Sequence, residues 1–317
     1  MIDQANTLEV RGATLHYKRR GAGPVLLIIQ GGAGDADSSD RLVDGLVDAY
    51  TVVTYDRRGL SRSALTGELI GTTLETHGDD GHHLLARVTT EPALVFCASL
   101  GAVIALDLTA RHPDQVHTLV AYEPASPQLL LETERTAAVL THANLEETFR
   151  REGVAATMVK MRGVSGTNFH DREPDLETPK RDAQAMARMA SNLAFFLTYD
   201  AGAAHLYKPD IAALRRAPTR IVPAAGQTSG EPGPAIPPWR SRPNSAPIFR
   251  SSQGTIQGRC CILGHSPFGF EQCSRKPTRA IERREAWRGA ATPSGRQVTI
   301  LLLILAYNFH TRTRDGQ

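Results

Sequence analysis

The chain has few of the residues that mark secreted or membrane proteins. It holds four cysteines in 317 residues, and two of them are adjacent, which fits neither a disulfide framework nor the Cys-x-x-Cys spacing of a metal site. No run of about 18 apolar residues is present, so we expect no membrane-spanning helix. The first residues carry neither a basic nor an apolar segment, and we expect no secretory signal. These absences favour a cytoplasmic protein in a reducing compartment, without a bound metal.

Charge and rare residue types are unevenly distributed. The net charge is +3, but residues 231–317 alone carry twelve arginines and one lysine against five acidic residues. The same segment holds both tryptophans, three of the four cysteines and nine of the 19 prolines. We interpret it as an atypical Pro/Arg-rich segment that is disordered or translated in a shifted reading frame. Its arginines are scattered among prolines without a binding motif, so we expect no nucleic-acid partner.

Before residue 230 the chain alternates between apolar strands and amphipathic helices. Four segments are predicted strands: residues 24–30, 50–55, 93–96 and 116–122. The first of them is a continuous apolar run, which is typical of a strand buried on both faces. Three segments with helical spacing of apolar side chains separate them: residues 38–49, 76–88 and 100–111. This alternation is typical of βαβ units and predicts an α/β fold with a mostly parallel sheet, which a hairpin at residues 7–18 precedes.

Residues 125–205 interrupt this alternation. They have helical character with no convincing strand, and the sheet resumes at residues 219–226. We therefore expect a helical insertion between two parts of one core, at residues 1–124 and 206–230. Four methionines of the insertion fall at apolar positions and are expected to pack in the core: Met158, Met161, Met186 and Met189.

Ser99 lies where the predicted strand at residues 93–96 meets the predicted helix at 100–111. The sequence of residues 97–101 is CASLG. Small residues on both sides of a serine let a strand turn tightly into a helix and expose the hydroxyl, which is the geometry of a nucleophile elbow. The usual pattern is Gly-x-Ser-x-Gly, and Cys97 is small enough to replace the first glycine. On this motif alone, a strand-to-helix turn without chemistry is equally consistent.

Four segments in this order resemble the α/β-hydrolase superfamily, over roughly residues 7–230. They are residues 30–34 (QGGAG), 55–63 (YDRRGLSRS), 97–101 (CASLG) and 123–124 (EP). In the second segment, Ser61 stands where the family's Asp-x-Arg-Gly-x-Gly-x-Ser loop has its second glycine. The resemblance implies an α/β-hydrolase fold with a helical cap inserted after the sixth strand. It points to serine-nucleophile members that are similar to esterases and prolyl aminopeptidases.

The resemblance also implies roles for single residues. Ser99 would be the nucleophile. The backbone N–H groups of Leu100 and Gly32 would form the oxyanion hole. Gln30 replaces a histidine that the family often has at this place, but the donor is a backbone group and need not be lost.

The histidine base and the acid would lie near the C-terminal end of the fold. Of eleven histidines, His265 in the sequence GHSPFGF is similar to the family's Gly-His-x-x-Phe loop. The family's acid position corresponds to Thr228, which has no carboxylate, so Glu231 and Glu123 are the alternatives. Three histidines on the early helix are expected at the surface instead: His77, His82 and His83.

The resemblance thus implies a serine hydrolase of a small ester, lactone, thioester or amide, acting through an acyl-enzyme at Ser99 without metal or organic cofactor. The alternative is a catalytically impaired member with an incomplete triad, which Thr228 and the composition of residues 231–317 motivate. In both cases we expect a small-molecule partner and no membrane partner.

Overall fold

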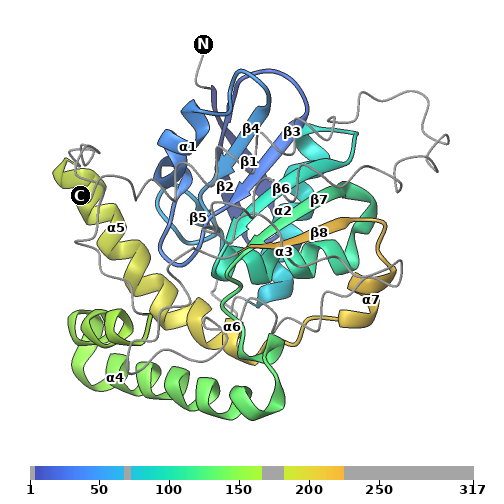
Figure 1. The fold of residues 1–317 in the computed structure, drawn as a ribbon. Coiled ribbons are helices and arrows are strands. Elements are labelled where there is room, and N and C mark those ends of the chain that lie inside the picture. The colour runs from blue at the N-terminus through green and yellow to red at the C-terminus, as the bar shows by residue number, and fades with distance from the viewer. Residues whose placement is uncertain (1–3, 68–72, 166–181, 225–317) are drawn as a thin grey trace, which may run out of the picture.

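A computed structural model describes residues 4–67, 73–165 and 182–224 (Figure 1). Its strands form one eight-stranded sheet of order β1-β2-β4-β3-β6-β7-β8, in which β5 also pairs with β2. The strands are β1 (Gln4–Val10), β2 (Ala13–Arg20), β3 (Val25–Ile29), β4 (Thr51–Tyr55), β5 (Ala64–Leu65), β6 (Ala93–Ala98), β7 (Val116–Tyr122) and β8 (Arg220–Ala224). The pairs that involve β2 are antiparallel, and the ladder from β4 to β8 is parallel. The predicted mostly parallel α/β fold is confirmed.

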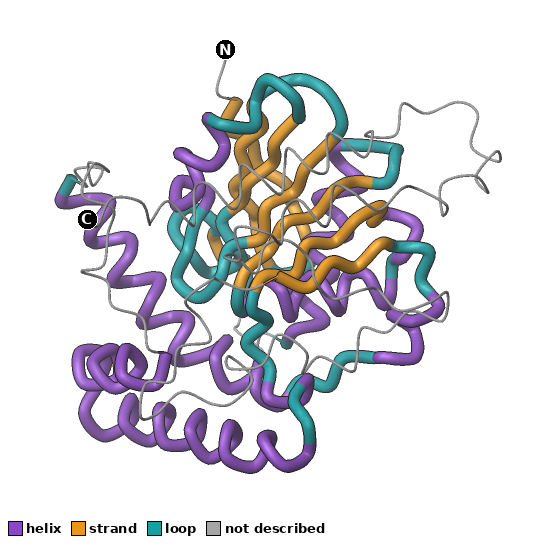
Figure 2. The backbone as a smooth tube through the Cα atoms, in the orientation of Figure 1, coloured by secondary structure: helices purple, strands orange, loops and turns teal. Residues whose placement is uncertain are grey.

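Helices cover the sheet and fill the interval between β7 and β8 (Figure 2). The α-helices are α1 (Asp40–Asp44), α2 (Leu74–Val88), α3 (Leu100–Arg111), α4 (Glu132–Ser165), α5 (Ala183–Phe195), α6 (Ala201–Leu206) and α7 (Ile211–Arg216). The shorter turns are η1 (Ala36–Ser39), η2 (Pro113–Gln115), η3 (Pro127–Leu129) and the π-helical turn η4 (Phe196–Asp200). Within the three described ranges, no helix combines the length and hydropathy of a membrane span.

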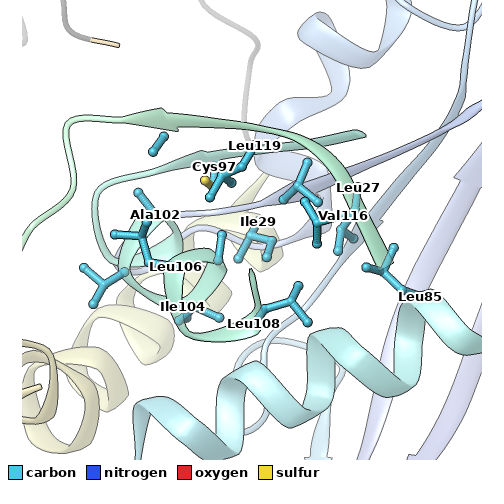
Figure 3. Close-up of a cluster of buried hydrophobic side chains, with 14 of the residues drawn as sticks. Leu27, Ile29, Leu85, Cys97, Ala102, Ile104, Leu106, Leu108, Val116 and Leu119 are labelled. Carbon is cyan, nitrogen blue, oxygen red and sulfur yellow. The ribbon is translucent and has the colours of Figure 1, made fainter. Parts of the chain in front are cut away.

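The parallel strands are buried on both faces because their side chains alternate between two cores. In β3, Leu27 and Ile29 join a core with α2, α3, α6 and α7, whereas Leu26 and Ile28 join a second core with α1. Figure 3 shows part of the first core, in which side chains of β3, β6 and β7 meet α3. This double burial explains the continuous apolar run at residues 24–30.

The strand order reverses at β3. The chain continues from β3 to β4 on one side of β3. It later returns to form β6 on the other side of β3, and β7 and β8 follow in that direction. In open α/β sheets, ligands bind beyond the carboxyl ends of the strands at such a reversal. The segments that leave β3 and β6 there are residues 30–35 and the turn at Ser99.

The helices α4, α5, η4 and α6, which lie between β7 and β8 within residues 132–206, are called the helical insertion below. In Figure 1, α4 and α5 stand apart from the sheet, and α6 leads back to the core. Met186 and Met189 of α5 are 63% and 48% exposed, so the prediction that they pack in the core is wrong. Asn192 of the same helix is buried instead, so α5 meets the core through a different face from the one predicted.

The predicted helix at residues 38–49 is shorter than expected. It consists of η1 and the five-residue α1, which ends at Asp44 with Gly45 as its C-cap. The side chain of Asp35 caps its start by accepting a hydrogen bond from the Ser38 N–H. Asp35 and Ser38 form a reciprocal capping box, a signal that the sequence contained.

Candidate active site

Ser99 has a backbone conformation that residues other than glycine rarely adopt. Its φ and ψ are 54° and −120°, and it sits between the last residue of β6 and the first of α3. Such a conformation costs on the order of 1–3 kcal/mol and persists only where the surroundings impose it. Within the described residues the Ser99 side chain makes no capping hydrogen bond to α3. The hydroxyl is therefore not used to cap the helix that it begins.

Backbone contacts hold this turn in place. The Ser99 N–H donates to the Tyr122 carbonyl at the end of β7, at 2.9 Å. The Ser99 carbonyl accepts from the N–H of Ala102 at 3.0 Å and from the N–H of Ala125 at 3.2 Å. A Cβ on Gly101 would overlap the carbonyl oxygen of Ile29. The glycine of CASLG is thus required because α3 begins directly against β3.

Cys97, at the first position of the motif, points away from the turn. It is fully buried in the core beneath α3, near Ala102 and Leu119 (Figure 3). Its thiol donates to the Val120 carbonyl at 3.2 Å. Burial raises the pKa of this thiol well above its usual range, so Cys97 behaves as a small apolar residue. This explains how the turn accommodates a cysteine in place of glycine.

The glycine segment after β3 lies against the serine. A Cβ on Gly31 would stand 3.0 Å from the Ser99 Cβ and 2.9 Å from the Ala98 carbonyl oxygen. The Gly34 N–H donates to the Gly31 carbonyl at 2.8 Å and closes a tight turn. Gly32 follows with a φ of +40°, which glycine tolerates. The segment can come this close to Ser99 because it carries no side chains at these positions.

Below this segment lies a fully buried ion pair. The Arg57 guanidinium donates through Nη1 to Asp200 Oδ2 of η4 at 2.8 Å, and through Nη2 to the Gly32 carbonyl. The other Asp200 oxygen lies 3.1 Å from His77 Nε2. Burial acts to raise the pKa of Asp200, but Arg57 and His77 outweigh it and hold the pKa at about 2.

His77 corrects one expectation from the sequence. It was predicted at the surface of the early helix, yet it is 1% exposed. Its partner Asp200 lies 123 positions later in the chain, so helical periodicity alone could not identify the contact. His83 on the same helix is exposed as predicted, and His82 is partly buried.

The second arginine of the loop after β4 has a different partner. Arg58 binds Asp80 of α2 through two bonds, at 2.7 and 2.5 Å, and also donates to the Arg11 carbonyl at 3.2 Å. Ser61 has a φ of 48°, the conformation that explains why the family's loop has glycine there. The motif at residues 55–63 thus connects the sheet to α2 and to the helical insertion.

Asn192 of α5 joins both loops to the helical insertion. Its Oδ1 accepts from the Ser61 N–H at 2.7 Å, and its Nδ2 donates to the Ala33 carbonyl at 3.1 Å and to Ser61 Oγ at 2.8 Å. Sequence reasoning missed Asn192, Asp200 and Arg57. Arg57 lies in the quoted segment 55–63, but that motif does not name its partners. For Asn192 and Asp200 the only signal was a polar or charged residue beside apolar ones, which does not distinguish a buried bond from an exposed side chain.

Three of the predicted site residues come together. Ser99, the adjacent Leu100 at the start of α3 and the Gly32 segment meet beyond the carboxyl ends of β3 and β6. Glu123, at the end of β7, has a φ of 44°, and its N–H donates to the Ala224 carbonyl at 2.9 Å. Three other predicted positions lie outside the described residues: Thr228, Glu231 and His265. Within the described ranges, no three His, Cys, Asp or Glu side chains are grouped to hold a metal ion.

Known proteins share this fold and sequence pattern. The family model of the alpha/beta hydrolase fold matches residues 24–161. The uncharacterized hydrolase YraK of Bacillus subtilis (strain 168) is 40% identical over 230 residues, which cover 71% of this chain and 79% of that protein.

Two solved structures are similar in fold. The carboxylesterase CesB (YbfK) from Bacillus subtilis has a TM-score of 0.52 at 13% identity, covering 75% of this chain and 82% of its own. The enol-lactonase from Burkholderia xenovorans LB400 has a TM-score of 0.52 at 18% identity, covering 70% and 81%. At these identities the likeness concerns the fold alone. From its sequence relative, its family match and its fold, the chain belongs to the α/β-hydrolase family and is a hydrolase.

Proposed function

We propose that the chain is a serine hydrolase that cleaves a small ester, lactone, thioester or amide through an acyl-enzyme at Ser99. The observation that carries the proposal is the conformation of Ser99 at the β6–α3 turn, with the glycine segment packed against its Cβ. A serine held at φ 54° on such a turn presents its hydroxyl beyond the end of the sheet. A hydroxyl there, beside backbone N–H groups, suits attack on an acyl carbon.

The proposed chemistry proceeds in two steps, acylation of Ser99 and hydrolysis of the acyl-enzyme. Ser99 Oγ attacks the acyl carbon while a histidine takes its proton, and the carbonyl oxygen becomes an oxyanion. When the bond to the leaving group breaks, that group takes the proton and departs, and the acyl group remains on Ser99. Water then attacks the acyl-enzyme by the same route and releases the acid.

Backbone donors would stabilise the oxyanion. Leu100 is the first residue of α3, and the first N–H groups of a helix have no partner within it. The Gly32 N–H is the second candidate, since the glycine segment touches the serine. Each such donor is worth about 10²–10³ in kcat in a serine hydrolase.

We assign the base to His265 and the acid to Glu231, with Glu123 as the alternative acid. A serine, a histidine and a carboxylate supply nucleophile, base and orientation, so this mechanism requires no metal or organic cofactor. We further propose that the helical insertion acts as the cap over the site, and that the protein acts in the cytoplasm on a small molecule.

The test is labelling with a fluorophosphonate, which reacts with an activated serine, together with hydrolysis of a short-chain p-nitrophenyl ester. Wild-type protein should label at Ser99, and Ser99→Ala should abolish both signals. Ser191→Ala, at an exposed serine of α5, is the matched control and should keep both. Absence of labelling in folded wild-type protein would instead support the catalytically impaired alternative.

A further inference from the structure

The peptide groups of the glycine segment are fixed one after another. The Gly31 carbonyl is held by the Gly34 N–H, the Gly32 carbonyl by Arg57, and the Ala33 carbonyl by Asn192. A peptide group is planar, so a bonded carbonyl also fixes the direction of the following N–H. The bond at Gly31 therefore sets the direction of the Gly32 N–H, and the next two bonds hold the turn that makes this bond.

Only the first of these bonds lies within the segment itself. Arg57 comes from the loop after β4, and its guanidinium is oriented by Asp200 of η4. Asn192 comes from α5 and is fixed by two bonds to Ser61. The phenyl ring of Phe196 lies 3.8 Å from where a Gly32 Cβ would stand. Side chains of the helical insertion thus hold the glycine segment in place, directly and through Arg57.

The ion pair between Arg57 and Asp200 is suited to hold the Gly32 carbonyl in a fixed position. The Arg57 and Asp200 side chains are both fully buried, at 0% exposure. A guanidinium has a rigid fork of donors, so Arg57 can bind the Asp200 carboxylate and the Gly32 carbonyl at the same time. A lysine ammonium would keep the charge but lacks this planar fork.

We propose that Arg57 and Asn192 are positioning residues of the oxyanion hole, through which the helical insertion keeps the Gly32 N–H aimed at the acyl group on Ser99. This inference rests on the proposed function and adds a role for residues outside the triad. Neither side chain is assigned contact with substrate. Their effect passes through the carbonyls of Gly32 and Ala33.

Arg57→Lys tests the proposal, and Arg58→Lys is its matched control. Both arginines belong to one loop and pair with a buried aspartate, but Arg58 binds Asp80 and the Arg11 carbonyl. With a p-nitrophenyl ester, Arg57→Lys should lower kcat about 10²-fold, the cost of losing one oxyanion donor, and change KM less than about threefold. Arg58→Lys should keep kcat within about threefold. Asn192→Leu, which removes the donor to Ala33, should lower kcat in the same manner as Arg57→Lys.

A second measurement separates positioning from loss of folding. A boronic acid forms a tetrahedral adduct with the serine, so its affinity should fall in parallel with kcat in Arg57→Lys and Asn192→Leu. Circular dichroism and urea unfolding establish the folded fraction, and kcat is expressed per folded molecule. If Arg57→Lys does not fold, Asn192→Leu carries the test.

The outcomes separate the two proposals. Wild-type labelling at Ser99 with an unchanged kcat and boronate affinity in the folded variants would overturn the positioning role and leave the serine hydrolase intact. An equal loss in Arg58→Lys would also overturn it, because the effect would then be general to this loop. If folded wild-type protein neither labels nor hydrolyses the ester, both proposals fail.

Discussion

Gly31 and Ser99 approach so closely that a methyl group on Gly31 would stand 3.0 Å from the Ser99 Cβ. The two residues come from different loops, after β3 and after β6, and meet because these strands are neighbours in the sheet. Real Cβ atoms rarely come this close to another heavy atom, so the distance between the segment and the serine depends on the absence of a side chain at position 31.

Gly31→Ala is expected to impair turnover more than stability. The new methyl group would also stand 2.9 Å from the Ala98 carbonyl oxygen, so the segment or the serine must move. A displacement of about 1 Å at a reacting centre can cost about 10²-fold in rate, and we expect a loss of that order in kcat/KM. Ester hydrolysis and urea unfolding measure the two effects.

Gly81→Ala is the control for this prediction. Gly81 lies on α2, away from Ser99. Its Cβ would stand 3.3 Å from the end of the flexible Leu108 side chain. It should keep wild-type kcat/KM. If Gly31→Ala were equally active, the close contact at Ser99 would have no catalytic importance.

Asp200→Asn is expected to cost about 3–5 kcal/mol in the free energy of unfolding, because it leaves the Arg57 charge buried without its counter-charge. The combined variant Arg57→Met with Asp200→Leu should recover most of this loss, since no charge then remains unpaired. Urea unfolding at pH 7 measures both. A cost below about 1 kcal/mol for the single variant would mean that water or another group compensates the arginine.

The stability of the helical insertion should fall in mild acid. The rings of His142 and His205 contact each other with centroids 3.6 Å apart and planes inclined by 33°, and His205 Nδ1 lies 3.2 Å from Glu146 Oε1. Burial, and for His142 also the His205 ring, lowers the pKa of both to about 4. The unfolded chain therefore binds more protons between about pH 6.5 and 4, and stability is lost as the pH falls through this range.

Removing one of these rings should flatten the pH dependence. His142→Phe is expected to reduce the difference in unfolding free energy between pH 7 and pH 5 by about 1–2 kcal/mol relative to wild type. His83→Gln, at an exposed histidine of α2, should leave that difference unchanged. Urea unfolding at the two pH values provides the comparison. Equal slopes for His142→Phe and wild type would show that the pair titrates normally.

Cys97 should be unreactive in the folded protein. Its thiol is fully buried, and burial raises its pKa far above neutrality, so the thiolate that reacts with alkylating reagents is absent. Iodoacetamide at pH 8 should label the peptide that contains Cys97 only after unfolding in urea, as mass spectrometry of that peptide can measure. Rapid labelling in native protein would contradict the packing beneath α3.

The sequence was sufficient to predict the features that depend on local pattern. The strands followed from short segments rich in apolar and β-branched residues, and the turn at Ser99 from small residues between a strand and a helix. The burial of His77 and the exposure of Met186 could not be predicted, because each depends on which face of a helix meets a distant segment. The same holds for the bonds that Arg57 and Asn192 make to the glycine segment. Their partners are far apart in the chain, and nothing in the local sequence points to them.

The contacts that hold the glycine segment join distant parts of the chain, which affects when they can form during synthesis. The bonds from Asn192 to Ala33 and from Arg57 to Asp200 join positions 159 and 143 residues apart. Contacts of such separation form late, after the intervening chain is available. When Ser99 of a nascent chain has emerged from the ribosome, the residues that hold the glycine segment beside it have not yet been added. The oxyanion site beside the serine should therefore form only after residue 200 has been added and the insertion has folded back onto the core, and the proposed base His265 is added later still.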